Sequence, residues 1–168
     1  MKRIPEPEYM DDREEADAYA ETDFSEVNAA FATRLLRHAP ALQRPRAVDL
    51  GCGPGDITLR AAAARRHWRL IGADASRAML MHAAALAGHR LHGPSPHWVA
   101  CDAKASPFAS GVFHIIFSNS ILHHMPDPGP FWREVKRLAA PGACLFLCDL
   151  YRPPSPGAAR ALVEKHAA

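Results

Sequence analysis

The chain has 168 residues, 48% hydrophobic and 23% charged, and a formal net charge of +2 at pH 7, which is typical of one globular domain. The small charge comes from scattered basic residues and does not favour nucleic acid or a membrane surface as partner, and no apolar run is long enough to span a bilayer. The first residues lead into acidic side chains rather than an apolar stretch, so we expect no secretory signal and a cytoplasmic location.

The first unit, residues 1–45, is expected to be an acidic arm followed by a helix. Carboxylates are dense between Glu6 and Glu26, and three aromatic residues are spaced among them: Tyr9, Tyr19 and Phe24. This pattern fits a solvated helix or arm, and it also fits a lid that folds over a ligand. Ser25 then opens a helix with an apolar stripe, which is predicted to end near Pro40.

The second unit, residues 46–168, alternates short apolar strands with helices. Five strands are predicted, at residues 47–50, 68–73, 97–101, 112–117 and 143–150. Helices are predicted at residues 56–66, 76–87 and 130–138, and a last one begins near residue 157. Strands alternating with helices predict right-handed crossovers and a doubly wound parallel sheet of the Rossmann-like α/β class. Ligands bind such sheets beyond the carboxyl ends of the strands.

A glycine-rich turn follows the first predicted strand, where Asp49 to Gly55 read Asp-Leu-Gly-Cys-Gly-Pro-Gly. Glycines let the backbone turn sharply and pass close under a ligand without a Cβ in the way. The helix behind the turn offers free N–H groups and the positive end of its dipole, which suit a carboxylate. A tight strand-to-helix turn without a ligand is the alternative interpretation.

Two acidic residues close the next two strands. Asp74 ends the second strand, where a carboxylate can accept both hydroxyls of a ribose. Asp102 follows the third strand and can accept a hydrogen bond from an exocyclic amine such as that of adenine. Each could alone be a helix cap or turn residue, but their place at successive strand ends favours a shared ligand.

Together with residues 117–127, Phe-Ser-Asn-Ser-Ile-Leu-His-His-Met-Pro-Asp, these motifs resemble class I S-adenosylmethionine-dependent methyltransferases. The nearest resemblance is to small-molecule members such as those of ubiquinone and menaquinone biosynthesis, and it covers about residues 46–150. It implies S-adenosyl-L-methionine as cofactor, S-adenosylhomocysteine as product and a small-molecule acceptor. The sulfonium is intrinsically activated, so the protein mainly aligns the acceptor with the methyl group.

The resemblance also implies which residues hold the cofactor. The methionine end falls to the turn, the ribose to Asp74, the adenine to residues 101–103 and the sulfonium region to residues 118–119. The full predicted set is Asp49, Gly51, Cys52, Gly53, Gly55, Asp74, Ala75, Met79, Cys101, Asp102, Ala103, Ser118 and Asn119.

The family implies seven strands with an antiparallel hairpin at one edge, whereas only one helix is predicted after the fifth strand of this sequence. We therefore expect about five strands, with the C-terminal hairpin missing. The fifth strand would then have an unprotected edge, through which a homodimer could form.

Two adjacent histidines follow the fourth strand, at the rim where an acceptor would lie. His123 or His124 could act as a general base or orient the acceptor, since imidazole exchanges protons near neutral pH. Capping or packing of the loop is the alternative. No metal site is expected, because the four cysteines form no CxxC pair and no third ligand accompanies the histidines.

Three functions are the alternatives to a small-molecule methyltransferase. A nicotinamide-dependent oxidoreductase shares the glycine turn and the acid after the second strand, but the late glycine of GxGxxG is absent here. A non-catalytic S-adenosylmethionine-binding or scaffold protein remains the main alternative. A methyltransferase acting on nucleic-acid base amines would be expected to carry an Asn/Asp-Pro-Pro-Tyr type motif after the fourth strand, which residues 118–121 do not match.

Overall fold

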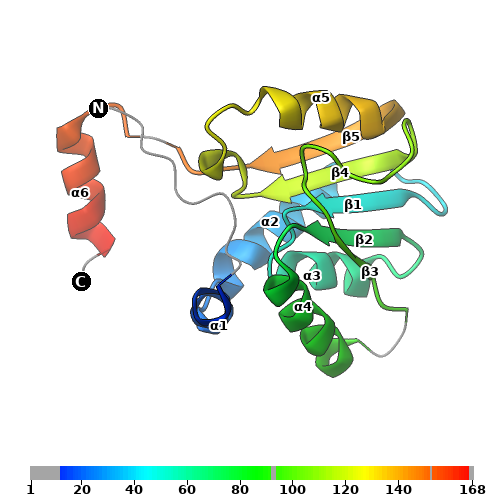
Figure 1. Ribbon diagram of the computed structural model, residues 1–168, viewed down its shortest axis with the longest axis horizontal. Helices are drawn as coiled ribbons and strands as arrows, with labels where there is room; N and C mark the ends of the chain where they lie inside the picture. The colour runs from blue at the N-terminus through cyan, green and yellow to red at the C-terminus, as the bar shows by residue number, and fades with distance from the viewer. Residues whose placement is uncertain (1–11, 92–93, 152, 167–168) are drawn as a thin grey trace.

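A central parallel sheet of five strands organises the chain, in a computed structural model that describes residues 12–91, 94–151 and 153–166. The strand order is β3-β2-β1-β4-β5, as predicted for a doubly wound Rossmann-like fold (Figure 1). The strands are β1 Arg46–Leu50, β2 Arg69–Asp74, β3 His97–Ala100, β4 Phe113–Asn119 and β5 Ala139–Cys148. The helices are α1 Arg13–Glu21, α2 Ser25–His38, α3 Asp56–Ala64, α4 Arg77–Arg90, α5 Gly129–Leu138 and α6 Pro156–His166, with a 3₁₀ turn η1 at Leu122–His124.

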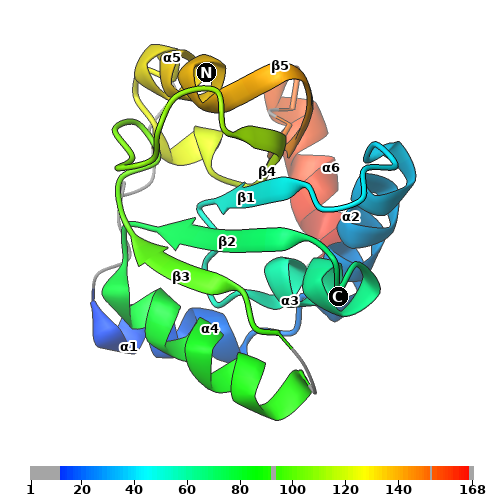
Figure 2. The ribbon, with the colours of Figure 1, turned by 90° about the vertical axis from the view of Figure 1, so that its right-hand side faces the viewer.

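Helices cover both faces of the sheet, as Figure 2 shows from the side. On one face, α2 and α3 pack their apolar side chains, including Phe31 and Ile57, against Ile115 and Phe117 of β4. On the other face, α5 packs Phe131 and neighbouring residues against β1 and β4. The central strands β1 and β4 are buried almost throughout, which explains their continuous apolar runs.

The predicted elements agree with the structure except at several boundaries. The fifth strand was predicted from residue 143, after a turn at Pro141–Gly142, but β5 begins at Ala139 directly after α5. The predicted start is four residues too late, because Ala139 already pairs with Phe113 of β4. The next pair is Ile115 with Cys144, so the register shifts between the two pairs. Pro141 and Gly142 therefore lie in an irregular part inside the strand.

The N-terminal unit lies against the sheet domain through α1 and α4. Ala16 of α1 is buried, and Asp17 contacts the His82 ring of α4 at 2.7 Å. The ring of Tyr19, in α1, lies 5.1 Å from the ring of Phe24, which directly precedes α2. The acidic segment therefore includes a helix held on the domain within the residues that the structure describes.

Within the described residues, the last helix, α6, does not pack against the sheet as α1 packs against α4. Figure 1 shows α6 apart from the sheet, and its apolar residues Leu162 and Val163 are exposed.

All four cysteines carry free thiols; Cys52 is buried and the other three are partly buried. None of the described helices is long and apolar enough to cross a membrane.

Candidate functional site

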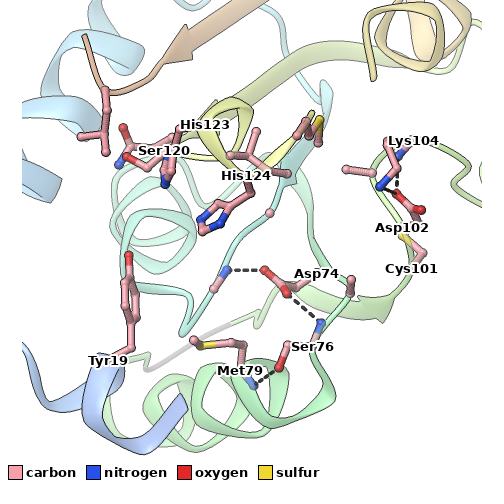
Figure 3. A pocket seen from close by; sticks show the side chains of 18 of the residues that line it. Tyr19, Asp74, Ser76, Met79, Cys101, Asp102, Lys104, Ser120, His123 and His124 are labelled. Carbon is pink, nitrogen blue, oxygen red and sulfur yellow. Dashed lines mark hydrogen bonds and ion pairs between the residues drawn. The ribbon is translucent and has the colours of Figure 1, made fainter. Parts of the chain in front are cut away.

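A cavity of about 320 Å³ opens at the carboxyl ends of the strands, on the side to which the arrowheads point in Figure 1 (Figure 3). Its volume is at the small end of the range for ligand sites. Its lining comes from the glycine turn, from the residues after β2, β3 and β4, and from the N-terminal unit. These residues are Tyr19, Phe24, Gly51, Gly53, Asp74, Ala75, Ser76, Met79, Cys101, Asp102, Ala103, Lys104, Asn119, Ser120, Ile121, His123, His124, Met125 and Leu150.

The glycine turn contributes two positions with different roles. Gly53 has a φ of +52°, and a Cβ built on it would meet nothing within 4 Å, so a side chain here would enter open space at the cavity. Gly55 has a φ of +83° and is the N-cap residue of α3, but a Cβ there would lie 2.8 Å from the Ala83 Cβ and from Trp98. Gly53 therefore keeps a ligand space open, whereas Gly55 allows close packing of α4 and β3 on the turn.

Asp49 lies buried near the end of β1. The Thr58 hydroxyl of α3 donates to its Oδ2 at 2.5 Å, which ties the strand to the helix around the turn. Burial, with the nearby charge of Asp74, raises the pKa of Asp49 to about 7. The cavity lining does not include Asp49, so this carboxyl supports the turn through Thr58 and does not face the cavity.

Asp74 joins the turn to the end of β2. Its Oδ2 accepts the Gly53 N–H at 2.7 Å, and its Oδ1 accepts the Ser76 N–H at 2.9 Å, as the dashed lines of Figure 3 mark. Burial raises the pKa of Asp74, and these N–H donors oppose the rise. Each carboxylate oxygen has a second lone pair, so Asp74 can hold the turn and still accept hydrogen bonds from a ligand.

The segment after β3 forms the wall beyond Asp74. Asp102 accepts the Lys104 N–H at 2.7 Å and pairs with the Lys104 ammonium group at 3.2 Å. Cys101 and Ala103 line the cavity beside them. This wall thus combines a carboxylate, placed by its own turn, with small apolar surfaces.

The segment after β4 brings two histidine rings to the cavity, with centroids 4.1 Å apart. Ser120 begins it with a φ of +59°, the one non-glycine positive φ among the described residues. His123 Nδ1 lies 2.8 Å from Asp149 Oδ1, and Asp149 Oδ2 accepts the Leu122 N–H at 2.5 Å. Asp149, which follows β5, therefore fixes both the η1 backbone and one histidine ring.

The structure brings eleven of the predicted site residues together around the cavity. The remaining four, Asp49, Cys52, Gly55 and Ser118, do not line it. Ser118 is buried, and its hydroxyl donates to the Leu50 carbonyl at 2.6 Å, so it links β4 to β1. Among the described residues, no three His, Cys, Asp or Glu side chains are grouped so as to hold a metal ion.

The site also contains residues that the sequence analysis did not assign. Asp149 follows β5, but the predicted fifth strand extended to residue 150 and placed Asp149 inside it, so the strand-end rule missed this residue. Ser76, Lys104 and Ser120 line the cavity too, and only the folded turns place them there. Lys104 could not have been distinguished from any exposed lysine by its sequence context.

The sheet domain of the chain is similar to known proteins. Residues 48–147 match the family model described as methyltransferase domain. Malonyl-[acyl-carrier protein] O-methyltransferase of Legionella pneumophila is 32% identical over 128 residues, 75% of this chain and 44% of that protein. 2-phytyl-1,4-naphtoquinone methyltransferase of Thermosynechococcus vestitus is 37% identical over 109 residues, 64% of this chain and 47% of that protein. The chain thus spans about half the length of these curated relatives.

A solved structure supports the same fold. Phosphoethanolamine N-methyltransferase 2 of Haemonchus contortus, in complex with S-adenosyl-L-methionine, aligns with a TM-score of 0.69 and 22% identity. The alignment covers 93% of this chain and 37% of that one. The family match extends over more than half of the chain and confirms the resemblance seen in the sequence. The chain belongs to the methyltransferase-domain family.

Proposed function

We propose that this chain binds S-adenosyl-L-methionine in the cavity at the strand ends and transfers its methyl group to a small-molecule acceptor. One observation carries the proposal. A left-handed glycine, Gly53, leaves open space at the cavity and donates its N–H to Asp74, while Asp102 lies in the adjacent wall. A ligand with hydroxyls and an amine fits these two carboxylates, and the backbone of the turn can approach it closely.

The residues present fit this cofactor by their charge as well. S-adenosyl-L-methionine carries a positive sulfonium and supplies an activated methyl group when bound. Asp102 is paired with Lys104, which also lines the cavity, so Asp74 is the carboxylate of the lining that favours a cationic ligand. The proposed contacts of the turn, Asp74 and residues 101–103 follow the predictions made from the sequence.

For the acceptor side, we propose His123 as the group that orients the acceptor or removes its proton, with Asp149 as its positioning residue. The neutral imidazole carries one ring hydrogen. If Asp149 accepts that hydrogen from Nδ1, the lone pair lies on Nε2. His123 lines the cavity and η1 holds it on the rim beside His124. A base is needed only for an acceptor that keeps its proton at neutral pH.

The N-terminal unit completes the proposed site. Tyr19 and Phe24 line the cavity, and Asp17 ties α1 to α4 through His82. These contacts support a lid formed by the described part of residues 1–45, from residue 12 onward, over a core at residues 46–168, whereas Tyr9 lies outside the described residues. A cytoplasmic location, the absence of a nucleic-acid acceptor and a homodimer through the edge of β5 stay predictions; the exposed Leu145 on that outer strand supports the last one.

Two assays on the same preparations test the proposal. Calorimetric binding of S-adenosylhomocysteine should weaken at least about tenfold in Asp74→Asn, because a charged acceptor for buried hydroxyls is lost. The matched control, Asp127→Asn, removes an exposed carboxylate outside the cavity and should bind as the wild type does. Equal affinity of Asp74→Asn and the control would contradict the cofactor site.

Methyl transfer is followed with labelled S-adenosyl-L-methionine and a panel of carboxylates and quinols, chosen because the relatives are named for such acceptors. His123→Asn and Asp149→Asn should bind the cofactor normally and lose turnover. Binding without transfer to any member of the panel would instead support the non-catalytic alternative.

A further inference from the structure

A second cavity, of about 700 Å³, lies at the opposite edge of the sheet, where the strands begin. It shares no lining residue with the first cavity. The first residues of β1, β2 and β3, Arg46, Arg69 and His97, all line it. These strand ends lie away from the arrowheads in Figure 1, so the second cavity cannot exchange ligands directly with the proposed methyl-transfer site.

The charge of this second cavity is one-sided. Four arginines line it, Arg44, Arg46, Arg66 and Arg69, and its described lining contains no Asp or Glu. Within the described parts of the chain, none of these guanidinium groups forms an ion pair. The four residues form two close pairs in the sequence, Arg44 with Arg46 and Arg66 with Arg69, and the pairing of β1 with β2 brings the two pairs together. Four positive charges thus surround one concave surface whose described lining holds no counter-charge.

Two of these arginines are direct neighbours in the sheet. Arg46 and Arg69 are register partners on β1 and β2, so both side chains leave the same face of adjacent strands. Backbones of adjacent strands are about 4.8 Å apart, and like charges placed side by side on one face are destabilising. Both strands lie inside the sheet, so their backbones stay in register, and only rotation of the two exposed side chains can separate the charges. An anion held between the two groups would turn this repulsion into attraction.

The chemistry of the cavity indicates which anion fits. A guanidinium presents paired N–H donors that match phosphate and carboxylate oxygens. A phosphate monoester carries nearly two negative charges and three acceptor oxygens, enough for two arginines at once, whereas a carboxylate carries one charge and two oxygens. Ile71, Phe108 and Val112 add apolar surface to the same cavity, on the face of the sheet that Arg46 and Arg69 share, and the cavity volume suits a small molecule rather than a polymer.

We propose that this cavity binds a small organic phosphate ester, with the phosphate between Arg46 and Arg69 and the organic part against the apolar wall. The proposal is independent of the methyltransferase function. It assigns a ligand to an arginine cluster that the proposed reaction does not use.

Calorimetric titration with 1-naphthyl phosphate tests the proposal, since this probe contains a phosphate and an aromatic group but no adenine. We expect saturable binding by the wild-type chain and at least ~10-fold weaker binding by the double variant R46Q/R69Q, because two charge-assisted hydrogen-bond donors are lost. The control variant Arg133→Gln removes the same kind of charge from an exposed position on α5 outside both cavities and should bind normally.

Two results of this titration would overturn the proposal. The first is equal affinity of R46Q/R69Q and the wild type, or no binding by either. The second is tighter binding of citrate or of a short single-stranded DNA than of 1-naphthyl phosphate, which would reassign the cavity to a polycarboxylate or a nucleic acid. Unchanged binding in Asp74→Asn is expected and separates this site from the cofactor site.

Thermal unfolding without ligand gives a second, independent test. Because Arg46→Gln removes a like-charge contact, it should raise the melting temperature above that of the wild type, whereas Arg133→Gln should leave it unchanged. The probe should then raise the melting temperature of the wild type more than that of R46Q/R69Q. A lower or unchanged melting temperature of Arg46→Gln would contradict the repulsion from which the site is inferred.

Discussion

Replacing Asp49 with asparagine should stabilise the chain above pH 7 and leave its stability nearly unchanged below pH 4. The carboxyl is buried, and its pKa of about 7 compares with an ordinary value of 3.8. Asparagine has nearly the same shape, and its carbonyl can still accept the hydrogen bond from Thr58. The substitution therefore removes the titration while it keeps the packing.

The sign and size of the effect follow from the two pKa values. Between pH 3.8 and about 7 the folded chain keeps a proton on Asp49 that the unfolded chain has lost, so rising pH favours unfolding across this window. Each tenfold difference in proton affinity is worth about 1.4 kcal/mol, and the gap therefore corresponds to roughly 4 kcal/mol at most. Asp49→Asn should keep its free energy of unfolding across this pH window, because asparagine does not titrate.

Urea unfolding at several pH values between 4 and 8 measures the difference directly. The free energy of unfolding of Asp49→Asn minus that of the wild type should grow from near zero at pH 4 to a few kcal/mol at pH 8. The control, Asp127→Asn, changes an exposed carboxylate and should run parallel to the wild type. A constant difference between Asp49→Asn and the wild type at every pH would refute the reasoning.

Three further changes test other parts of the structure. Gly53→Val should abolish binding of S-adenosylhomocysteine, because the side chain enters the cavity from a left-handed position; normal affinity in calorimetry would contradict this. Ser120→Gly should be about 1 kcal/mol more stable than Ser120→Ala in urea, since only glycine relieves the positive φ; equal stability would mean no strain there. Glu134→Gln should cost roughly 2 kcal/mol at pH 7, because Arg137 holds the pKa of Glu134 at about 2 and the substitution breaks that pair. The Glu134 contribution is present above pH 4.5 and fades as the pH falls toward 2, so a cost that persists undiminished at pH 3 would be inconsistent with the pair.

Most of the fold could be predicted from the sequence, because most strands are short apolar runs that end close to a glycine, proline or acidic residue. The glycine turn follows β1, Asp74 is the last residue of β2, and Asp102 follows β3. Where two signals compete, the boundary was misplaced. Pro141 and Gly142 resemble a turn before a strand, yet pairing of Ala139 with Phe113 extends β5 back to the end of α5.

The candidate site was harder to predict from the sequence than the fold, because the direction of each side chain is not visible in a motif. A motif shows that a residue is near a turn, but not whether its side chain faces a ligand or supports the turn from behind. Asp49 and Gly55 belong to the motif, but the fold places them in hydrogen bonding to Thr58 and in packing against α4. The pairing of His123 with Asp149 depends on β4 and β5 being adjacent, and the arginine cluster depends on the register of β1 and β2.

The account depends most on the identity of the ligand at the strand ends. Calorimetric titration of the chain with S-adenosyl-L-methionine, S-adenosylhomocysteine and NADH tests it most directly. The account predicts saturable one-to-one binding of the first two and none of NADH. Binding of NADH, or no binding of either S-adenosyl compound by a chain whose fold is verified by circular dichroism, would contradict it.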